Sequence, residues 1–150
     1  MKIFRSFLSV ILILVATVLV SCGSPQASAP PTYTPEKLQQ IETYRIPVDN
    51  ARNNMSRLKE LIQEQDWVDT RSYIHGPLGF LRRDFRYLSD SLLPNDAKQA
   101  KAISEDIFLR LENIDAAAKD QDARTVATEF NKAISDFDEY IDLIPNTEAS

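Results

Sequence analysis

Hydrophobic side chains recur at intervals of three and four residues along four stretches of the chain after residue 34. This spacing is typical of amphipathic helices. The first predicted helix begins with Thr34 as N-cap and Pro35 in the first helical position. Because Pro47 lies inside it, we expect a kink or a short break there. Its hydrophobic positions are Leu38, Ile41, Tyr44, Val48, Ala51, Met55, Leu58 and Leu61 or Ile62.

The second predicted helix follows Asp66, whose carboxylate can cap it, and ends near Leu93-Pro94. Its hydrophobic positions are Ile74, Leu78, Leu81, Phe85, Leu88 and Leu92. The segment from His75 to Gly79 places two glycines and a proline in this register, which is costly inside a helix. We therefore expect a locally bent start, with the regular helix beginning at Pro77 and the glycines allowing close approach of a neighbouring helix. A direct binding role of the segment is the alternative.

The third predicted helix starts near Asn95, and the fourth runs from Ala123 to a stop at Pro145. Their hydrophobic positions are Ala100, Ile103, Ile107, Leu111, Ile114 and Ala118 in the third, and Ala123, Ala127, Phe130, Ile134, Phe137, Ile141 and Ile144 in the fourth. Short connections between amphipathic helices favour an all-α, up-down-up-down four-helix bundle over residues 35–145, followed by a tail at 146–150. The alternative is an extended pair of helical hairpins that dimerises. We expect a monomer with Ile74, Leu81, Phe85, Ile107, Phe130 and Phe137 in the core.

The first 21 residues have the layout of a secretory signal peptide, with Lys2 and Arg5 before an apolar stretch that ends in Leu19-Val20-Ser21-Cys22-Gly23. This end is similar to a bacterial lipobox, in which the cysteine is acylated and becomes the mature N-terminus. An uncleaved anchor helix is the alternative, although the apolar run is short for a membrane span. Residues 22–34 are rich in proline and predict an extended tether that could reach about 35 Å.

Charge and residue usage exclude several classes of function. The signal peptide holds two of the 17 basic residues and none of the 22 acidic ones, so the mature chain carries a side-chain charge of −7 and is a poor partner for nucleic acid. Cys22 is the only cysteine, so no internal disulfide can form. With one histidine, no Glu-x-x-His pair and no glycine-rich phosphate loop, the sequence predicts neither an enzyme nor a bound cofactor or metal. A surface metal contact through His75 and nearby carboxylates stays open.

Candidate partner-binding residues gather in the second predicted helix. Trp67 at its start covers the end of the core or, alternatively, docks a partner. The tyrosines Tyr73, Tyr87 and Tyr140 are expected to straddle core and solvent, and service on a partner surface is the alternative for each. Arg82, Arg83 and Arg86 form a basic group that either pairs with carboxylates of the bundle, such as Asp90, or recognises an acidic partner. The candidate set is His75, Gly76, Pro77, Arg82, Arg83, Arg86 and Trp67.

Two motifs and a shorter run between them connect the sequence to a known family. The run Ile74-His75-Gly76-Pro77-Leu78-Gly79-Phe80-Leu81-Arg82-Arg83, then Leu92-Leu93-Pro94-Asn95-Asp96, and then Phe108, Leu111 and Ile114-Asp115-Ala116-Ala117-Ala118 resemble cyanobacterial members of the PsbQ family. The resemblance covers roughly residues 36–144 and is most specific in the second and third helices.

The resemblance implies a non-catalytic extrinsic subunit on the lumenal face of photosystem II, lipid-anchored to the thylakoid membrane. Its neighbours would be PsbO and a chlorophyll-binding inner antenna protein, and its role would be to stabilise the oxygen-evolving complex and its calcium and chloride. The chain supplies no recognisable ligand for the manganese cluster. The alternatives are a helical cell-envelope lipoprotein that acts as adaptor or chaperone and, less favoured, a periplasmic metal-binding bundle.

Overall fold

The computed structural model describes residues 31–145 of the 150-residue chain. The chain separates into two compact units, Met1–Pro31 and Thr32–Ser150, and the fold below is that of the second. The predicted signal peptide, the lipidation at Cys22, most of the linker and the tail at 146–150 lie outside the described residues. Within residues 31–145, none of the helices combines the length and hydrophobicity that crossing a bilayer requires.

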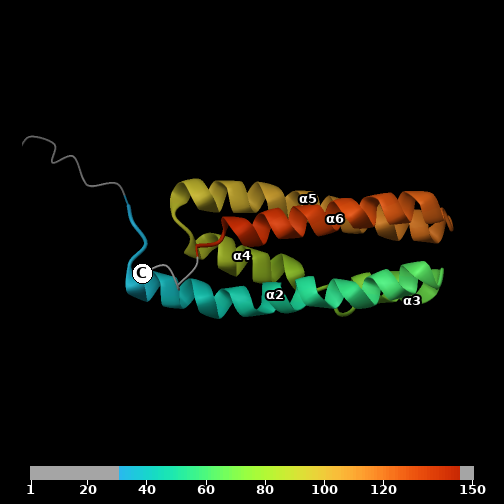
Figure 1. Ribbon diagram of the computed structural model, residues 1–150, viewed down its shortest axis with the longest axis horizontal. Helices are drawn as coiled ribbons and strands as arrows, with labels where there is room; N and C mark the ends of the chain where they lie inside the picture. Colours follow the sequence, from blue (N-terminus) through green and yellow to red (C-terminus); the bar gives the residue numbers. More distant parts are fainter. Residues whose placement is uncertain (1–30, 146–150) are drawn as a thin grey trace, which may run out of the picture. The chain divides into compact units, whose positions relative to one another are not determined.

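The described residues form five helices and no strands, which confirms the all-α class. The helices are α2 (Pro35–Gln63), α3 (Trp67–His75), α4 (Leu81–Ser91), α5 (Pro94–Lys119) and α6 (Ala123–Leu143). Figure 1 shows α2 and α5 running in one direction and α3, α4 and α6 returning. Both α3 and α4 contact α2 and α5, and α6 packs against α5 and α2. Together, α3 and α4 take the place of the single second helix that the sequence predicts.

Polar caps begin three of the helices. The Thr34 hydroxyl accepts a hydrogen bond from the Lys37 amide at 3.3 Å, and the Asp66 carboxylate accepts one from the Asp69 amide at 3.0 Å, which confirms both predicted caps. Of the two alternatives at Pro47, the break is wrong, because α2 continues through it, and the kink stays a prediction. Pro47 lies on the exposed side of α2, where water can satisfy the carbonyl that loses its helical partner.

The second predicted helix is divided by a turn at residues 76–80. Regular helix resumes at Leu81 rather than at the predicted Pro77. In the turn, the Gly79 amide donates to the Gly76 carbonyl at 3.0 Å and the Leu81 amide to the Leu78 carbonyl at 3.1 Å. A Cβ atom at Gly79 would lie 2.6 Å from the His75 carbonyl oxygen. This glycine therefore accommodates the backbone of its own turn, and the predicted approach of a neighbouring helix is wrong.

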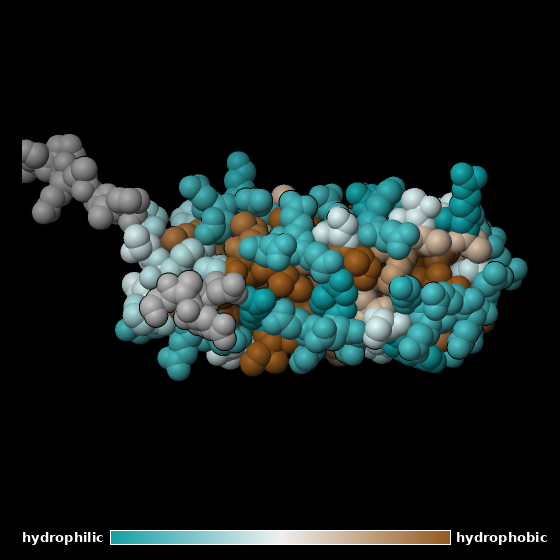
Figure 2. Space-filling model, in the orientation of Figure 1, coloured by the Kyte–Doolittle hydropathy of each residue, from teal (hydrophilic) through white to brown (hydrophobic). Residues whose placement is uncertain are grey.

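The core contains all six predicted residues, each at most 8% exposed. The fourth-helix stripe is partly wrong, because Ala123 and Ala127 are exposed while Val126, Ala133 and Tyr140 are fully buried. Figure 2 shows how the charged remainder of the helices leaves a mostly hydrophilic surface, with hydrophobic patches along the middle of the face drawn.

Tyr140 does not straddle core and solvent as predicted but lies inside an aromatic cluster. Its ring centroid is 4.5 Å from that of Phe85, which also contacts Phe137 and Phe108 at 5.5 and 5.6 Å. The Tyr140 hydroxyl is 2.9 Å from Ser89 Oγ, so its polar atom is satisfied within the core. Burial raises the pKa of Tyr140 to about 12 although the hydrogen bond with Ser89 opposes the shift. The neutral phenol thus joins α4 to α6.

The end of the predicted linker is attached to the helices. Tyr33 packs against the core, and its hydroxyl donates to Asp96 Oδ2 at 2.5 Å while accepting from the Leu93 amide at 3.1 Å. Burial and the contact with Asp96 raise the pKa of Tyr33 to about 12. The chain therefore enters α2 from a fixed point beside the turn between α4 and α5.

Candidate functional site

One side of the bundle, where α3 and α4 lie against α5, is lined by four of the candidate residues: Trp67, His75, Arg82 and Arg86. Three depressions follow this line, with volumes of about 430, 260 and 370 Å³. His75 lines the first and second depressions, and Arg82 lines the second and third. Neighbouring depressions therefore share a wall residue and form one continuous line. We call this feature the α3/α4–α5 groove.

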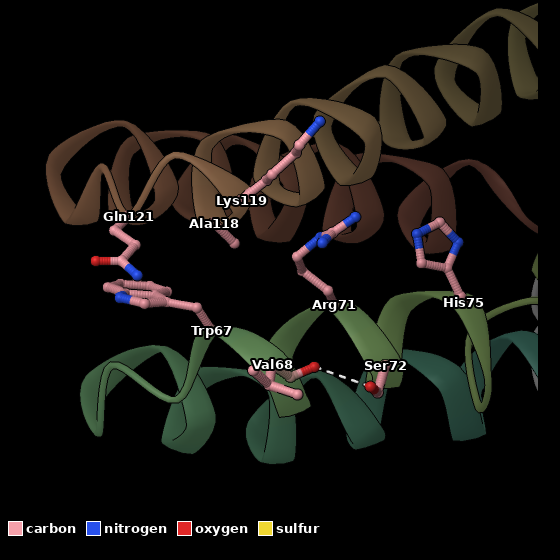
Figure 3. A pocket seen from close by; sticks show the side chains of 8 residues that line it. All are labelled: Trp67, Val68, Arg71, Ser72, His75, Ala118, Lys119 and Gln121. Carbon is pink, nitrogen blue, oxygen red and sulfur yellow. Dashed lines mark hydrogen bonds between the residues drawn. The ribbon is translucent and has the colours of Figure 1, made fainter.

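Trp67 lies at the end of the groove. Figure 3 shows its ring beside the Gln121 side chain, at the connection between α5 and α6. Trp67 is partly buried and packs against the core, which confirms that it covers the core end. The next residue, Val68, is 75% exposed and also lines the first depression. A partner contact at Trp67 stays a prediction.

Asp115 connects α3 to α5 in the middle of the groove. One of its oxygens, Oδ1, accepts a hydrogen bond from Arg71 Nε at 3.0 Å and lies 2.9 Å from His75 Nε2. Burial acts to raise the pKa of Asp115, but the hydrogen bonds from Arg71 and His75 outweigh it and hold this pKa below its ordinary value. The two sequence motifs that carry the family resemblance therefore meet at this contact.

His75 has no further metal-binding neighbours in the described part of the chain. Within residues 31–145, no group of three or more His, Cys, Asp or Glu side chains is placed to hold a metal ion. The His75 side chain is 67% exposed and its ring points toward α5 (Figure 3). Gly76 and Pro77 follow it on the exposed turn that joins α3 to α4.

The three arginines of α4 have different surroundings. Arg82 crosses the groove, with its guanidinium 4.0 Å from the Phe108 ring centroid and 3.3 and 3.8 Å from the carboxylates of Glu105 and Glu112. Arg83 pairs with the adjacent Asp84 at 2.9 Å. Arg82 is thus paired with carboxylates of the bundle, which is one of the two alternatives that the sequence predicts for these arginines.

Arg86 differs from both of these arginines. The predicted pairing with Asp90 does not form, because Asp90 binds Lys101 at 2.6 Å. No carboxylate within residues 31–145 forms an ion pair with Arg86, and its guanidinium instead lies 5.3 Å from the Tyr87 ring centroid. Arg86 also lines the third depression of the groove.

Sequence reasoning missed two kinds of residue. The first is the set of α5 carboxylates, since Asp115, Glu105 and Glu112 are identified only by the helices that fold against them. The second is Phe80, which is 63% exposed and lies outside the hydrophobic register of α4. That mismatch is the signal that could have found it. Tyr87, which the sequence places between core and solvent, is 45% exposed.

A further charged cluster joins α5 to α6. Glu129 is buried, and hydrogen bonds from Lys132 and Asn113 lower its pKa against the effect of burial. Arg110 lies 3.5 Å from Glu129 and 3.2 Å from Asp136. Because these charged groups pair with one another, we assign the cluster a structural role.

Comparison with known proteins agrees with the motifs. A profile of the PsbQ family, described as oxygen evolving enhancer protein 3, matches residues 4–145. CyanoQ of Synechocystis sp. is 50% identical over 146 residues, which cover 97% of this chain and 98% of that protein. A match over nearly the whole length extends the likeness beyond the two motifs to all five described helices. The chain therefore belongs to the PsbQ family, whose members are non-catalytic extrinsic subunits of photosystem II.

Proposed function

We propose that this chain is a lipid-anchored subunit on the lumenal face of photosystem II, beside PsbO and a chlorophyll-binding inner antenna protein. It stabilises the oxygen-evolving complex and helps to retain its calcium and chloride. The observation that carries the proposal is the 50% identity to CyanoQ over 97% of the chain. The absence of a three-residue metal-binding group within residues 31–145 suits a role in which the ions are bound elsewhere and this subunit supports the complex.

The docking surface in this proposal is the region around α3, α4 and the turn between them. It contains the predicted contact residues His75, Gly76, Pro77, Arg82, Arg83, Arg86 and Trp67. Two features support this choice. The turn is exposed although its glycine geometry is tightly constrained, so it presents a fixed backbone surface. The helix before it, α3, is joined to α5 by Asp115, which preorganises this part of the surface for binding.

Attachment to the thylakoid membrane would come from acyl chains on Cys22, with the helical unit itself bound to the protein complex. Stable anchoring of this kind takes more than one chain or a second contact. The two attachments can be tested separately. We expect loss of the lipid to release the protein from membranes that lack photosystem II. Loss of the docking surface should instead release it from the purified complex.

The experiment that tests the function compares a strain that lacks this protein with its parent. We expect lower oxygen evolution in the deletion strain, with the defect increasing when calcium and chloride are limiting. The tagged protein should co-purify with thylakoid membranes and with photosystem II. A chain that remains with other envelope membranes, and whose loss leaves oxygen evolution unchanged under ion limitation, would instead support the adaptor role.

A further inference from the structure

Four side chains form an exposed strip on α4 and on the residue before it: Phe80, Arg83, Arg86 and Tyr87. We call this the α4 outer strip. The Arg83 guanidinium lies 5.2 Å from the Phe80 ring centroid, and that of Arg86 lies 5.3 Å from the Tyr87 ring centroid. Tyr44 of α2 stacks on Tyr87 with centroids 5.9 Å apart and so supports the strip from the side. Each exposed ring thus has one arginine side chain beside it.

Folding alone does not explain the strip. Phe80 and Tyr87 keep 63% and 45% of their surface exposed, so a large part of their apolar area gains nothing from the core. Buried positions of the same helix, such as Phe85 and Leu88, are at most 1% exposed. Aromatic and arginine side chains together are the residues that dominate the centres of protein interfaces.

The charges of the strip are incompletely neutralised by the chain itself. Arg86 has no carboxylate partner within residues 31–145, and Arg83 has only Asp84, whose side chain is 13% exposed. Lys101 occupies the nearby Asp90. Arg82, by contrast, is held by two glutamates of α5. On a chain with a net charge of −5, the strip is therefore a local positive site that attracts carboxylates.

We propose that the α4 outer strip is the contact with photosystem II and that it binds an acidic protein surface, on which carboxylates meet Arg83 and Arg86 while Phe80 and Tyr87 are covered. This inference rests on the proposed function and narrows its docking surface: Arg82 is paired with Glu105 and Glu112 and is not a contact. Binding to an anionic membrane is the alternative occupant, and the experiment below distinguishes it from an acidic protein surface.

The test uses the mature chain and photosystem II membranes washed free of their extrinsic subunits. One variant carries Arg83→Glu and Arg86→Glu, and a second carries Phe80→Ala and Tyr87→Ala. A third variant, Arg82→Glu, reverses the arginine that is paired with Glu105 and Glu112 and so separates the strip from the wider docking surface. Matched controls are Arg124→Glu, which reverses an exposed arginine on α6, and Leu109→Ala, which truncates an exposed residue on α5. Circular dichroism confirms that each variant is folded.

We expect each strip variant to weaken binding at least about tenfold, whereas each control changes binding less than about threefold. The effect of the charge variant should shrink at high salt, and that of the aromatic variant should persist.

Folded strip variants that bind as well as the parent overturn the inference, and so does an Arg82→Glu effect as large as that of the strip. Binding of the parent to vesicles of phosphatidylcholine and phosphatidylglycerol, lost in the strip variants, would assign the strip to the membrane and also overturn it. Failure of the parent chain to bind the washed membranes contradicts the proposed function instead.

Discussion

His75 Nε2 lies 2.9 Å from Asp115 Oδ1, across the interface between α3 and α5. Arg71 donates to the same oxygen one turn earlier on α3. Because α3 has only nine residues, it has little packing surface of its own, and two hydrogen bonds to one carboxylate are a substantial part of its attachment. The contact holds the exposed turn at residues 76–80 in place.

We expect Asp115→Asn to lower the free energy of unfolding by about 1–2 kcal/mol, because both charge-assisted hydrogen bonds lose their charged acceptor. Urea unfolding followed by circular dichroism measures the change. The matched control is Asp138→Asn, which removes a carboxylate that pairs with Arg52 but is 53% exposed, and it should cost less than about 1 kcal/mol. Equal effects at the two positions would show that Asp115 has no special role.

The hydrogen bonds of Asp115 also predict that the stability of the protein depends on pH. The folded-state pKa of Asp115 is depressed below the ordinary value of 3.8, so the stability it contributes is present above that value and is lost as the pH falls through the folded-state pKa. The difference in unfolding free energy between the parent and Asp115→Asn should therefore be full at about pH 6 and vanish in strong acid. A difference that stays constant across this range would contradict the assignment.

The aromatic cluster predicts a large cost for truncation at its centre. Phe85→Ala should destabilise the protein by about 3–5 kcal/mol, because Phe85 contacts three other rings and its loss leaves a cavity. Phe80→Ala removes the same atoms from a position that is 63% exposed and should cost less than about 0.5 kcal/mol. Thermal unfolding of the two variants provides the comparison, and similar midpoints would mean that the core is misplaced.

A substitution at Thr70 is expected to preserve or raise the stability of the protein instead of lowering it. Its hydroxyl is buried on α3 and has no hydrogen-bond partner within residues 31–145. Thr70→Val keeps the shape and removes the unsatisfied polar group, so stability should stay the same or rise by up to about 1 kcal/mol. Thr70→Ala, which leaves a small cavity, should lower it. A destabilising valine would reveal a partner for the hydroxyl, such as water.

The sequence predicted the hydrophobic face of each helix better than the helix ends. The glycines and the proline between His75 and Leu81 predict a bend, but the full division into α3 and α4 does not follow from the apolar pattern. Ile74, Leu78 and Leu81 keep helical spacing through the turn, which still buries Leu78. The spacing of apolar residues therefore does not report a change of backbone at the glycines. Tyr140 was misplaced for a different reason: its hydroxyl is satisfied by Ser89, a residue 51 positions away that only the fold brings near.

For the candidate site, the sequence located α3 and α4 but not the separate roles of their residues. Arg82, Arg83 and Arg86 form one basic group along the chain. Their environments diverge because the α5 carboxylates that face Arg82 lie 23 and 30 residues away in sequence. Pairing across helices is a tertiary property, and the spacing within one helix contains no information about it.

The anchor makes a separate prediction. Cys22→Ser should leave the helical fold intact, because the core begins after the tether, but it should release the protein from membranes. Membrane fractionation in cells that lack photosystem II measures this without the docking contact. A serine variant that stays membrane-bound after a high-salt wash would contradict the lipid anchor.

The most direct test of the function is a binding measurement between the purified mature chain and photosystem II depleted of extrinsic subunits. We expect saturable binding that reaches a fixed ratio of subunit to complex, with cross-links to lumenal proteins of photosystem II. Oxygen evolution at limiting calcium and chloride should rise in proportion to the bound fraction. Binding that never saturates, or a saturated complex whose oxygen evolution is unchanged, would contradict the account.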